Sequence, residues 1–358
     1  NRAPDADAFV EALRGFRTIH QNVVFADTAG HWGYRLGGRI PLRGGERPPI
    51  RPRPGWTGEA EWTGFLPFEE HPHALAPEAG YVVTANNRQQ ADSVGGLISN
   101  DMWSLPHRAE RITRLVEGSD AHDVASMLAI QMDVTTLQGL RHRDVAAAGY
   151  RAAGDEAAAA LLEAWDGDTG LDGVEPTLFH TWWDALRGEL SLEVWGRRGG
   201  FVSAAGVERW IDQGLPEGVA QAAARRALER GGPLPWGEQH YLHLDHQLAA
   251  VPILQRLFGF ARTGIPVPGS PATPNVAGYG VDTKGRYRVT WGASERHVSD
   301  LAEEVGWFVL PGGQSGYPAG PHTDDQLELW LFGGLVPLPL TRQGVEEVAR
   351  ARLRIVPE

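Results

Sequence analysis

The sequence predicts an α+β protein that forms a single domain over residues 1–358. Two observations lead to this class: strand-like runs fall near both ends of the chain, and helical periodicity fills its middle. Strands and helices do not alternate in the regular βαβ order of a parallel sheet. No clean linker and no internal repeat divide the chain, so we expect one domain.

The chain opens with a predicted helix that is followed by a hairpin. Phe9, Leu13 and Phe16 have the i, i+4, i+7 spacing of an amphipathic helix, here over residues 5–16. Two short runs within residues 22–34, separated by a Thr-Ala-Gly turn, are typical of paired antiparallel strands.

A proline-rich stretch and a second apolar run follow the hairpin. Residues 44–58 contain four prolines, which predicts an irregular surface loop. Residues 80–85 are mostly apolar and end at Asn86 and Asn87. We interpret this run as a buried strand that carries two polar side chains into a site.

The middle of the chain is predicted to be helical and its last part to return to strands. A helix is expected over residues 108–117, and a second one after Ser119, which would cap it while Ala125, Leu128 and Met132 face inward. Alanine-rich helical pieces follow at 145–164 and 218–229, and strands are expected at 287–291 and 307–310.

Composition excludes several classes of function. The formal net charge is −12 and no run of Lys or Arg stands out, which argues against a nucleic-acid-binding or membrane-binding surface. The absence of cysteine excludes disulfides, thiolate catalysis and Cys-type zinc sites. No signal peptide or long apolar span is present. Asn1 stands where an initiator Met would, which suggests a processed product.

Short motifs along nearly the whole chain resemble those of penicillin acylases, and they occur in the same order. They are QNVVFAD at 21–27 with GY at 33–34 and GRIP at 38–41, WTGFLPF at 62–68, NN at 86–87, RAERI at 108–112, LEAWDG at 162–167, PGGQSG at 311–316, PH at 321–322 and DQ at 325–326. The chain is therefore similar to the C-terminal part of the large subunit of a penicillin-acylase-type hydrolase.

The resemblance implies a four-layer αββα fold of the N-terminal-nucleophile type and hydrolysis of an acyl amide. The substrate class would be a β-lactam side chain, an acyl-homoserine lactone or an acylated peptide. Autocatalytic cleavage of a precursor frees a serine that is both nucleophile and, through its α-amine, its own base. Asn1 has no hydroxyl or thiol. The expected partner is an upstream segment of the same precursor, and the expected location is periplasmic or secreted.

Two residues match the catalytic positions of the family. Asn86 matches its oxyanion-hole asparagine, a neutral donor placed where the carbonyl oxygen becomes negative. Arg108 matches its active-site arginine. The alternatives are an ordinary turn residue for Asn86 and a solvated helix-start residue for Arg108. Asn22 and Asp27 also match motif positions, where pairing within the hairpin competes with substrate contact.

The C-terminal motif is interpreted as structural. Gln314, Ser315 and His322 lie in a Gly- and Pro-rich loop that fits a tight backbone close to the site. Ser315 is not flanked like the nucleophile of a G-x-S-x-G elbow.

Metal-based chemistry is the competing hypothesis. A zinc-dependent hydrolase would use His240, His243, Asp245 and His246. Of these, His243, Asp245 and His246 resemble the second half of the H-x-H-x-D-H motif of metallo-β-lactamase-like hydrolases, but Tyr241 occupies the place of its first histidine. The matched mechanism requires no cofactor. The family resemblance leaves room for a structural calcium, although the position that would match its carboxylate is Leu97, with Asp92 and Asp101 nearby.

A third hypothesis is a catalytically inactive or purely structural fragment. A chain without an N-terminal Ser, Thr or Cys does not run the mechanism by itself. A coding sequence upstream of Asn1 that contains the serine would distinguish the enzyme from the fragment.

Overall fold

The computed structural model describes residues 2–44, 53–89, 103–196, 200–230, 232–303 and 305–354. These residues divide into two compact units. The first unit comprises Asn1–Ala109 with Leu301–Glu303, and the second comprises Glu110–Asp300 with Glu304–Glu358. The division describes how compactly the residues pack and does not test whether the units fold independently. The single domain over residues 1–358 therefore stays a prediction.

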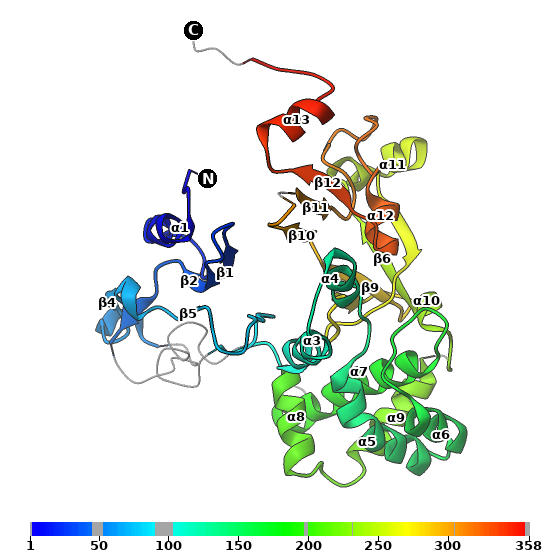
Figure 1. Ribbon diagram of the computed structural model, residues 1–358. Coiled ribbons are helices and arrows are strands. Elements are labelled where there is room, and N and C mark those ends of the chain that lie inside the picture. Colours follow the sequence, from blue (N-terminus) through cyan, green and yellow to red (C-terminus); the bar gives the residue numbers. More distant parts are fainter. Residues whose placement is uncertain are drawn as a thin grey trace. The chain divides into compact units, whose positions relative to one another are not determined.

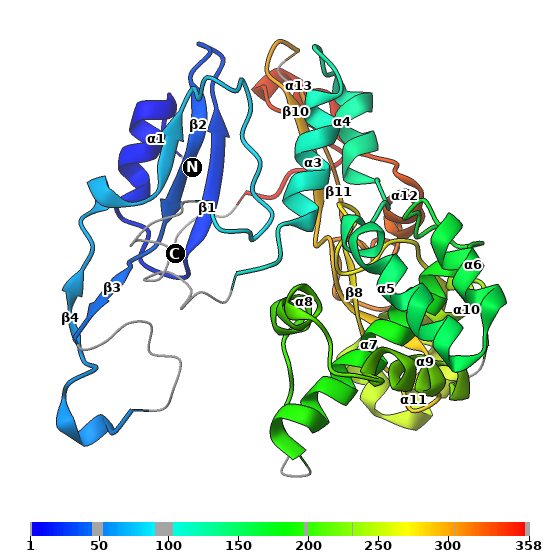
Figure 2. The same ribbon diagram turned by 90° about the horizontal axis from the view of Figure 1, so that it is seen from below.

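The first unit contains a helix packed on a three-stranded sheet (Figure 2). Helix α1 (Ala6–Leu13) begins where the Asp5 carboxylate accepts a hydrogen bond from the N–H of Ala8, at 2.8 Å. The antiparallel sheet has the order β1-β2-β5, and its bounds are β1 (Gln21–Ala26), β2 (Trp32–Gly37) and β5 (His73–Leu75). Ring packing between Phe9 and Phe25 joins helix and sheet. The predicted helix and hairpin are confirmed.

The predicted strand over residues 80–85 is wrong. The segment from Tyr81 to Ala85 joins no sheet and forms no helix. The other strands of this unit, β3 (Pro41–Arg43) and β4 (Trp62–Phe65), form a separate two-stranded pair, and short 3-10 turns lie at Gly55–Thr57 and Phe68–Glu70. Of the predicted proline-rich loop, residues 45–52 lie outside the described residues.

The larger hydrophobic core described in the second unit is helical (Figure 1). It is formed by α5 (Leu137–Ala153), α6 (Glu156–Ala164), α7 (Glu175–Trp195) and α9 (Val219–Glu229). Fully buried alanines on three of these helices, such as Ala146, Ala159 and Ala223, let the backbones approach closely, and Trp182 and Phe179 fill the centre. Both predicted alanine-rich helical regions are confirmed.

Shorter helices are also present, and one of them begins later than predicted. Helix α3 (His107–Glu117) matches the expected helix, and α8 (Ala204–Gln213) and α10 (Trp236–Gln239) were not predicted. Helix α4 (Val124–Gln131) is capped by Asp123, which exchanges hydrogen bonds with Ser126 in a capping box. The prediction of Ser119 as the cap is wrong, since its hydroxyl bonds the carbonyl of Ala121 within the loop.

Two sheets complete the second unit. One has the order β7-β6-β9-β8, and the other has the order β10-β11-β12. Their bounds are β6 (His240–Leu244), β7 (Arg262–Pro266), β8 (Ala277–Val281), β9 (Tyr287–Gly292), β10 (Arg296–Asp300), β11 (Val305–Val309) and β12 (Val336–Pro339). Helix α12 (Leu327–Phe332) contributes Leu327 and Trp330 to the core between these elements. The strands expected at 287–291 and 307–310 are confirmed.

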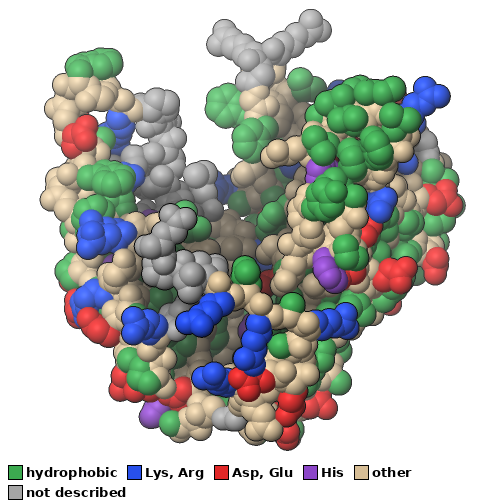
Figure 3. Space-filling model, turned by 90° about the horizontal axis from the view of Figure 1, so that it is seen from above, with side chains coloured by type: hydrophobic (Ala, Val, Ile, Leu, Met, Phe, Trp, Pro, Cys, Tyr) green, Lys and Arg blue, Asp and Glu red, His purple; other side chains and the backbone are tan. Residues whose placement is uncertain are grey.

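Hydrophobic side chains gather on the surface of the second unit over α11 (Pro252–Phe258) (Figure 3). Ile253, Leu257 and Phe258 are each at least 59% exposed, so this helix contributes little to the core. The preceding 3-10 turn (Gln247–Ala250) and the last helix, α13 (Arg342–Val348), are also superficial. No helix among the described residues has the length and apolar character needed to cross a bilayer.

Candidate active site

Asn86 adopts a conformation that is uncommon outside glycine. Its φ angle is 62°, in the left-handed region, where Asn is one of the few residues tolerated. Its carbonyl accepts a hydrogen bond from the N–H of Ser104 at 3.1 Å. The side chain is exposed while the preceding Ala85 is buried. The turn therefore directs the amide of Asn86 away from the interior of the first unit.

Arg108 fixes the orientation of that amide. Its Nη2 donates to Oδ1 of Asn86 and to the carbonyl of Ala85, both at 2.8 Å. A guanidinium has only donors, so it must face the oxygen of the Asn86 amide and not the nitrogen. Within the part of the chain that the structure describes, Nδ2 of Asn86 donates no hydrogen bond. No described residue therefore occupies the two N–H groups of this amide.

Burial shapes the electrostatics of the pair. It lowers the pKa of Arg108 from the ordinary value of a guanidinium, but arginine keeps its charge at neutral pH. A fixed positive charge one hydrogen bond away from the Asn86 amide favours negative charge developing beside it. Asn86 and Arg108, 22 positions apart in sequence, are in hydrogen-bond contact, and their catalytic roles stay a prediction.

The two hairpin residues that match the motif have different contacts. Asn22 is hydrogen-bonded to the segment before Asn86, and Asp27 is hydrogen-bonded within the turn after β1. Asn22 on β1 donates from Nδ2 to Oγ1 of Thr84 at 2.7 Å. Asp27 accepts hydrogen bonds from the backbone N–H groups of Ala6, Ala29 and His31. The bond from the His31 N–H contributes most to lowering the pKa of Asp27, to about 2. Asp27 therefore belongs to the β1–β2 turn.

The contacts of the C-terminal loop agree with its structural interpretation. The N–H of Ser315 donates to the carbonyl of His322 at 2.9 Å, and Oγ of Ser315 accepts from the N–H of Tyr317 at 3.1 Å. A Cβ at Gly313 would lie 2.1 Å from the carbonyl of His322, so this close approach requires glycine. His322 pairs with Asp325 at 2.7 Å. The loop, which also contains Gln314, is closed by its own hydrogen bonds.

The four residues of the zinc hypothesis do not converge on one point, and only His243 and Asp245 contact each other. Nδ1 of His240, which is fully buried, lies 2.7 Å from the carbonyl of Val267. His243 pairs with the exposed Asp245 at 3.3 Å, and His246 contacts the carbonyl of Gly316 at 3.2 Å. Among the described residues these four do not form a group with metal-ligand spacing.

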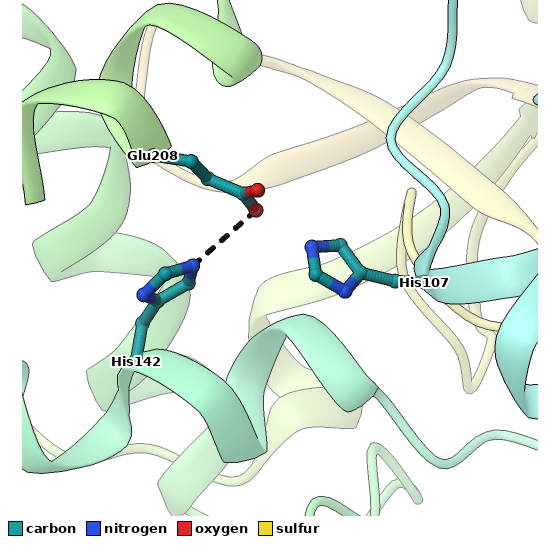
Figure 4. A group of neighbouring side chains, drawn as sticks. All are labelled: His107, His142 and Glu208. Carbon is teal, nitrogen blue, oxygen red and sulfur yellow. Dashed lines mark ion pairs between the residues drawn. The ribbon is translucent and has the colours of Figure 1, made fainter. Parts of the chain in front are cut away.

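Figure 4 shows a buried ion pair that the sequence did not indicate. Nε2 of His142 on α5 lies 3.3 Å from Oε1 of Glu208 on α8, and Gln138 donates to the same oxygen at 3.3 Å. His107, also labelled in Figure 4, begins α3 and belongs to the first unit. The second unit by itself supplies one imidazole and one carboxylate here, fewer than the three protein ligands of a catalytic zinc site.

The calcium expectation concerns residues that the structure does not describe. Asp92, Leu97 and Asp101 all lie between residues 90 and 102, outside the described ranges.

Thr84 is a residue of the candidate site that the sequence gave no reason to select. Its partner Asn22 lies 62 positions earlier, and only the folded chain brings the two together.

Comparison with solved structures supports the fold class. The chain matches the thermostable penicillin G acylase from Alcaligenes faecalis with a TM-score of 0.65 and 17% sequence identity, over 100% of this chain and 71% of that one. The mixture of helices and sheets and this likeness confirm the predicted α+β fold of an N-terminal-nucleophile hydrolase. The chain belongs to the penicillin amidase family, whose model matches residues 1–347.

Curated relatives carry the names of acylases. Penicillin acylase 2 proenzyme of Pseudomonas sp. (strain SE83) is 30% identical over 97% of this chain and 47% of its own length. The acyl-homoserine lactone acylase QuiP of Pseudomonas syringae pv. tomato is 27% identical over 100% of this chain and 48% of its own length. The chain thus spans about half the length of these relatives.

Proposed function

We propose that this chain is part of an acylase that hydrolyses the amide bond between an acyl group and an amine. Family membership and the names of the relatives support the class of reaction. By name, the relatives act on different acyl amides, penicillin or an acyl-homoserine lactone, so the proposal covers acyl amides as a class.

In the proposed mechanism a serine supplied by another segment of the precursor attacks the carbonyl carbon of the substrate. Its α-amine takes the hydroxyl proton, and the carbonyl oxygen becomes an oxyanion. Asn86 donates an N–H of its side chain to that oxyanion. The C–N bond then breaks, the amine leaves with the proton, and water hydrolyses the acyl-enzyme. The proenzyme name of one relative is consistent with a nucleophile freed by processing.

One observation carries the assignment of the site: the bond from Arg108 to Oδ1 of Asn86, at 2.8 Å. An oxyanion donor must point at the developing charge before the reaction, since reorientation during the step would cost free energy. Arg108 supplies this preorganisation because it determines which end of the Asn86 amide faces outward. The left-handed backbone conformation of Asn86 also directs its side chain outward.

Separate expression tests the requirement for the second segment. Residues 1–358 alone are expected to show no turnover of acyl-amide substrates, because the nucleophile is missing. The same chain produced together with the upstream segment of its precursor is expected to hydrolyse them. Robust hydrolysis by residues 1–358 alone would show that this chain contains its own nucleophile and would refute the proposal.

We also propose that the reaction needs no zinc, because the mechanism uses an organic base and His240, His243 and His246 are engaged separately. Dialysis of the assembled enzyme against a zinc chelator is expected to leave kcat unchanged. Loss of activity that zinc alone restores would favour the metal-dependent hydrolase instead.

A further inference from the structure

The backbone that leads to Asn86 is held by side chains because it belongs to no sheet or helix. Asn87 Oδ1 accepts the N–H of Ala85 at 3.0 Å and Nε2 of Gln89 at 3.0 Å. Gln89 also donates to the carbonyl of Val83 at 3.2 Å. These bonds are local, so they shape the segment but do not attach it to the sheet of the first unit.

The attachment to the sheet comes from Asn22 and Thr84. Asn22 lies within β1, where its backbone is in register with Leu36 of β2, so its position is fixed by a strand pair. Its Nδ2 donates to Thr84 Oγ1 at 2.7 Å, a short bond in a partly buried place. Thr84 precedes Asn86 by two residues. A movement at Thr84 would therefore be transmitted directly to the left-handed turn.

We propose that Asn22 and Thr84 form a positioning pair that holds Asn86 at the distance an oxyanion donor requires. The inference rests on the proposed function of Asn86. An effective donor lies about 2.7–3.1 Å from the oxyanion, and a misplacement of about 1 Å can cost on the order of a hundredfold in rate. Arg108 sets the direction of the Asn86 amide, and the Asn22–Thr84 bond sets where the turn lies relative to the sheet.

The test removes the acceptor without changing the shape of residue 84. In the assembled enzyme, Thr84→Val replaces the hydroxyl by a methyl group, and Thr84→Ser retains the hydroxyl. We expect kcat per active site to fall roughly tenfold in Thr84→Val with KM changed less than about twofold, and Thr84→Ser to recover most of it. Asn22→Ala should have the same effect, and the double variant should be little worse than either single variant, because both remove one interaction.

Active sites are counted from the burst of released product, so unfolded or unprocessed molecules do not lower the measured kcat. A purely structural role would lower the melting temperature and the number of active sites while kcat per site stayed normal, and that result would overturn the proposal. Additive losses in the double variant would also overturn it.

Asn86→Ala measured in the same assay separates this inference from the proposed function. A large loss in Asn86→Ala with normal kcat in Thr84→Val would refute only the positioning pair. A normal kcat in Asn86→Ala would refute the oxyanion assignment itself, whatever the result at Thr84.

Discussion

At the scale of residues, the order of the motifs selected candidate site residues but did not supply their geometry. Asn86 and Arg108 could be selected because they stand in motifs that resemble the family's. The φ angle of 62° at Asn86 and the hydrogen bond from Arg108 to its amide oxygen depend on a turn whose partners lie elsewhere in the chain. Thr84 could not be selected at all, since a threonine in an apolar run carries no signal of its own.

The histidines show the opposite case, in which a local pattern misleads. The spacing from His240 to His246 resembles ligands, but spacing does not reveal burial. His240 is enclosed by the core, and this burial lowers its pKa to about 4, so it is a neutral core residue at physiological pH. His246 instead accepts the N–H of Leu248 at the start of a 3-10 turn.

At the scale of elements, amphipathic helices could be predicted and the most buried helix could not. Helix α7 is apolar or aromatic on most sides, with Phe179, Trp182 and Leu186 all fully buried, so it lacks the one-sided periodicity that marks a surface helix. The strand prediction for the segment before Asn86 was wrong for a related reason. The apolar residues of this segment suggested a strand, but no neighbouring strand pairs with it among the described residues. Side-chain hydrogen bonds hold the segment where a strand would have backbone hydrogen bonds to a neighbour.

Helix α7 also contains an acid whose protonation should affect stability. Burial raises the pKa of Asp184 to about 6, against the lowering influence of Arg187 and Arg230. A pKa raised on folding favours the protonated folded state, so its stabilising effect is complete below about pH 4 and is lost as pH rises through about 6. Asp184→Asn should remove this dependence. The variant should exceed the parent in free energy of unfolding by roughly 3 kcal/mol above pH 7, and by little below pH 4.

Urea denaturation at a series of pH values measures this difference. Asp144→Asn is the matched control, because it removes the same formal charge from a side chain that is 79% exposed. Its effect on stability should be small throughout the series. A difference between Asp184→Asn and the parent that does not change with pH would contradict the interpretation of Asp184.

At the scale of the whole molecule, the fold class and the family could be predicted because motifs recur in order over nearly the entire chain. The fold of an N-terminal-nucleophile hydrolase and membership of the penicillin amidase family agree with that prediction. The division into two compact units was not foreseen, since its boundary follows Ala109 inside α3 and no linker marks it. The chain covers about half of its curated relatives, so the acyl pocket and the nucleophile cannot be deduced from these residues.

The proposed stabilisation of the oxyanion by Asn86 can be measured through kcat of the Asn86→Ala variant in the assembled, processed enzyme. Asn86→Asp is the companion variant, because it keeps the contact with Arg108 but has no N–H to donate. Glu78→Ala, at an exposed position of the same unit, is the control and should leave kcat unchanged. Both Asn86 variants are expected to lose roughly a hundredfold to a thousandfold in kcat. A near-normal kcat in Asn86→Ala would refute the role of Asn86 as oxyanion donor and leave it as a turn residue.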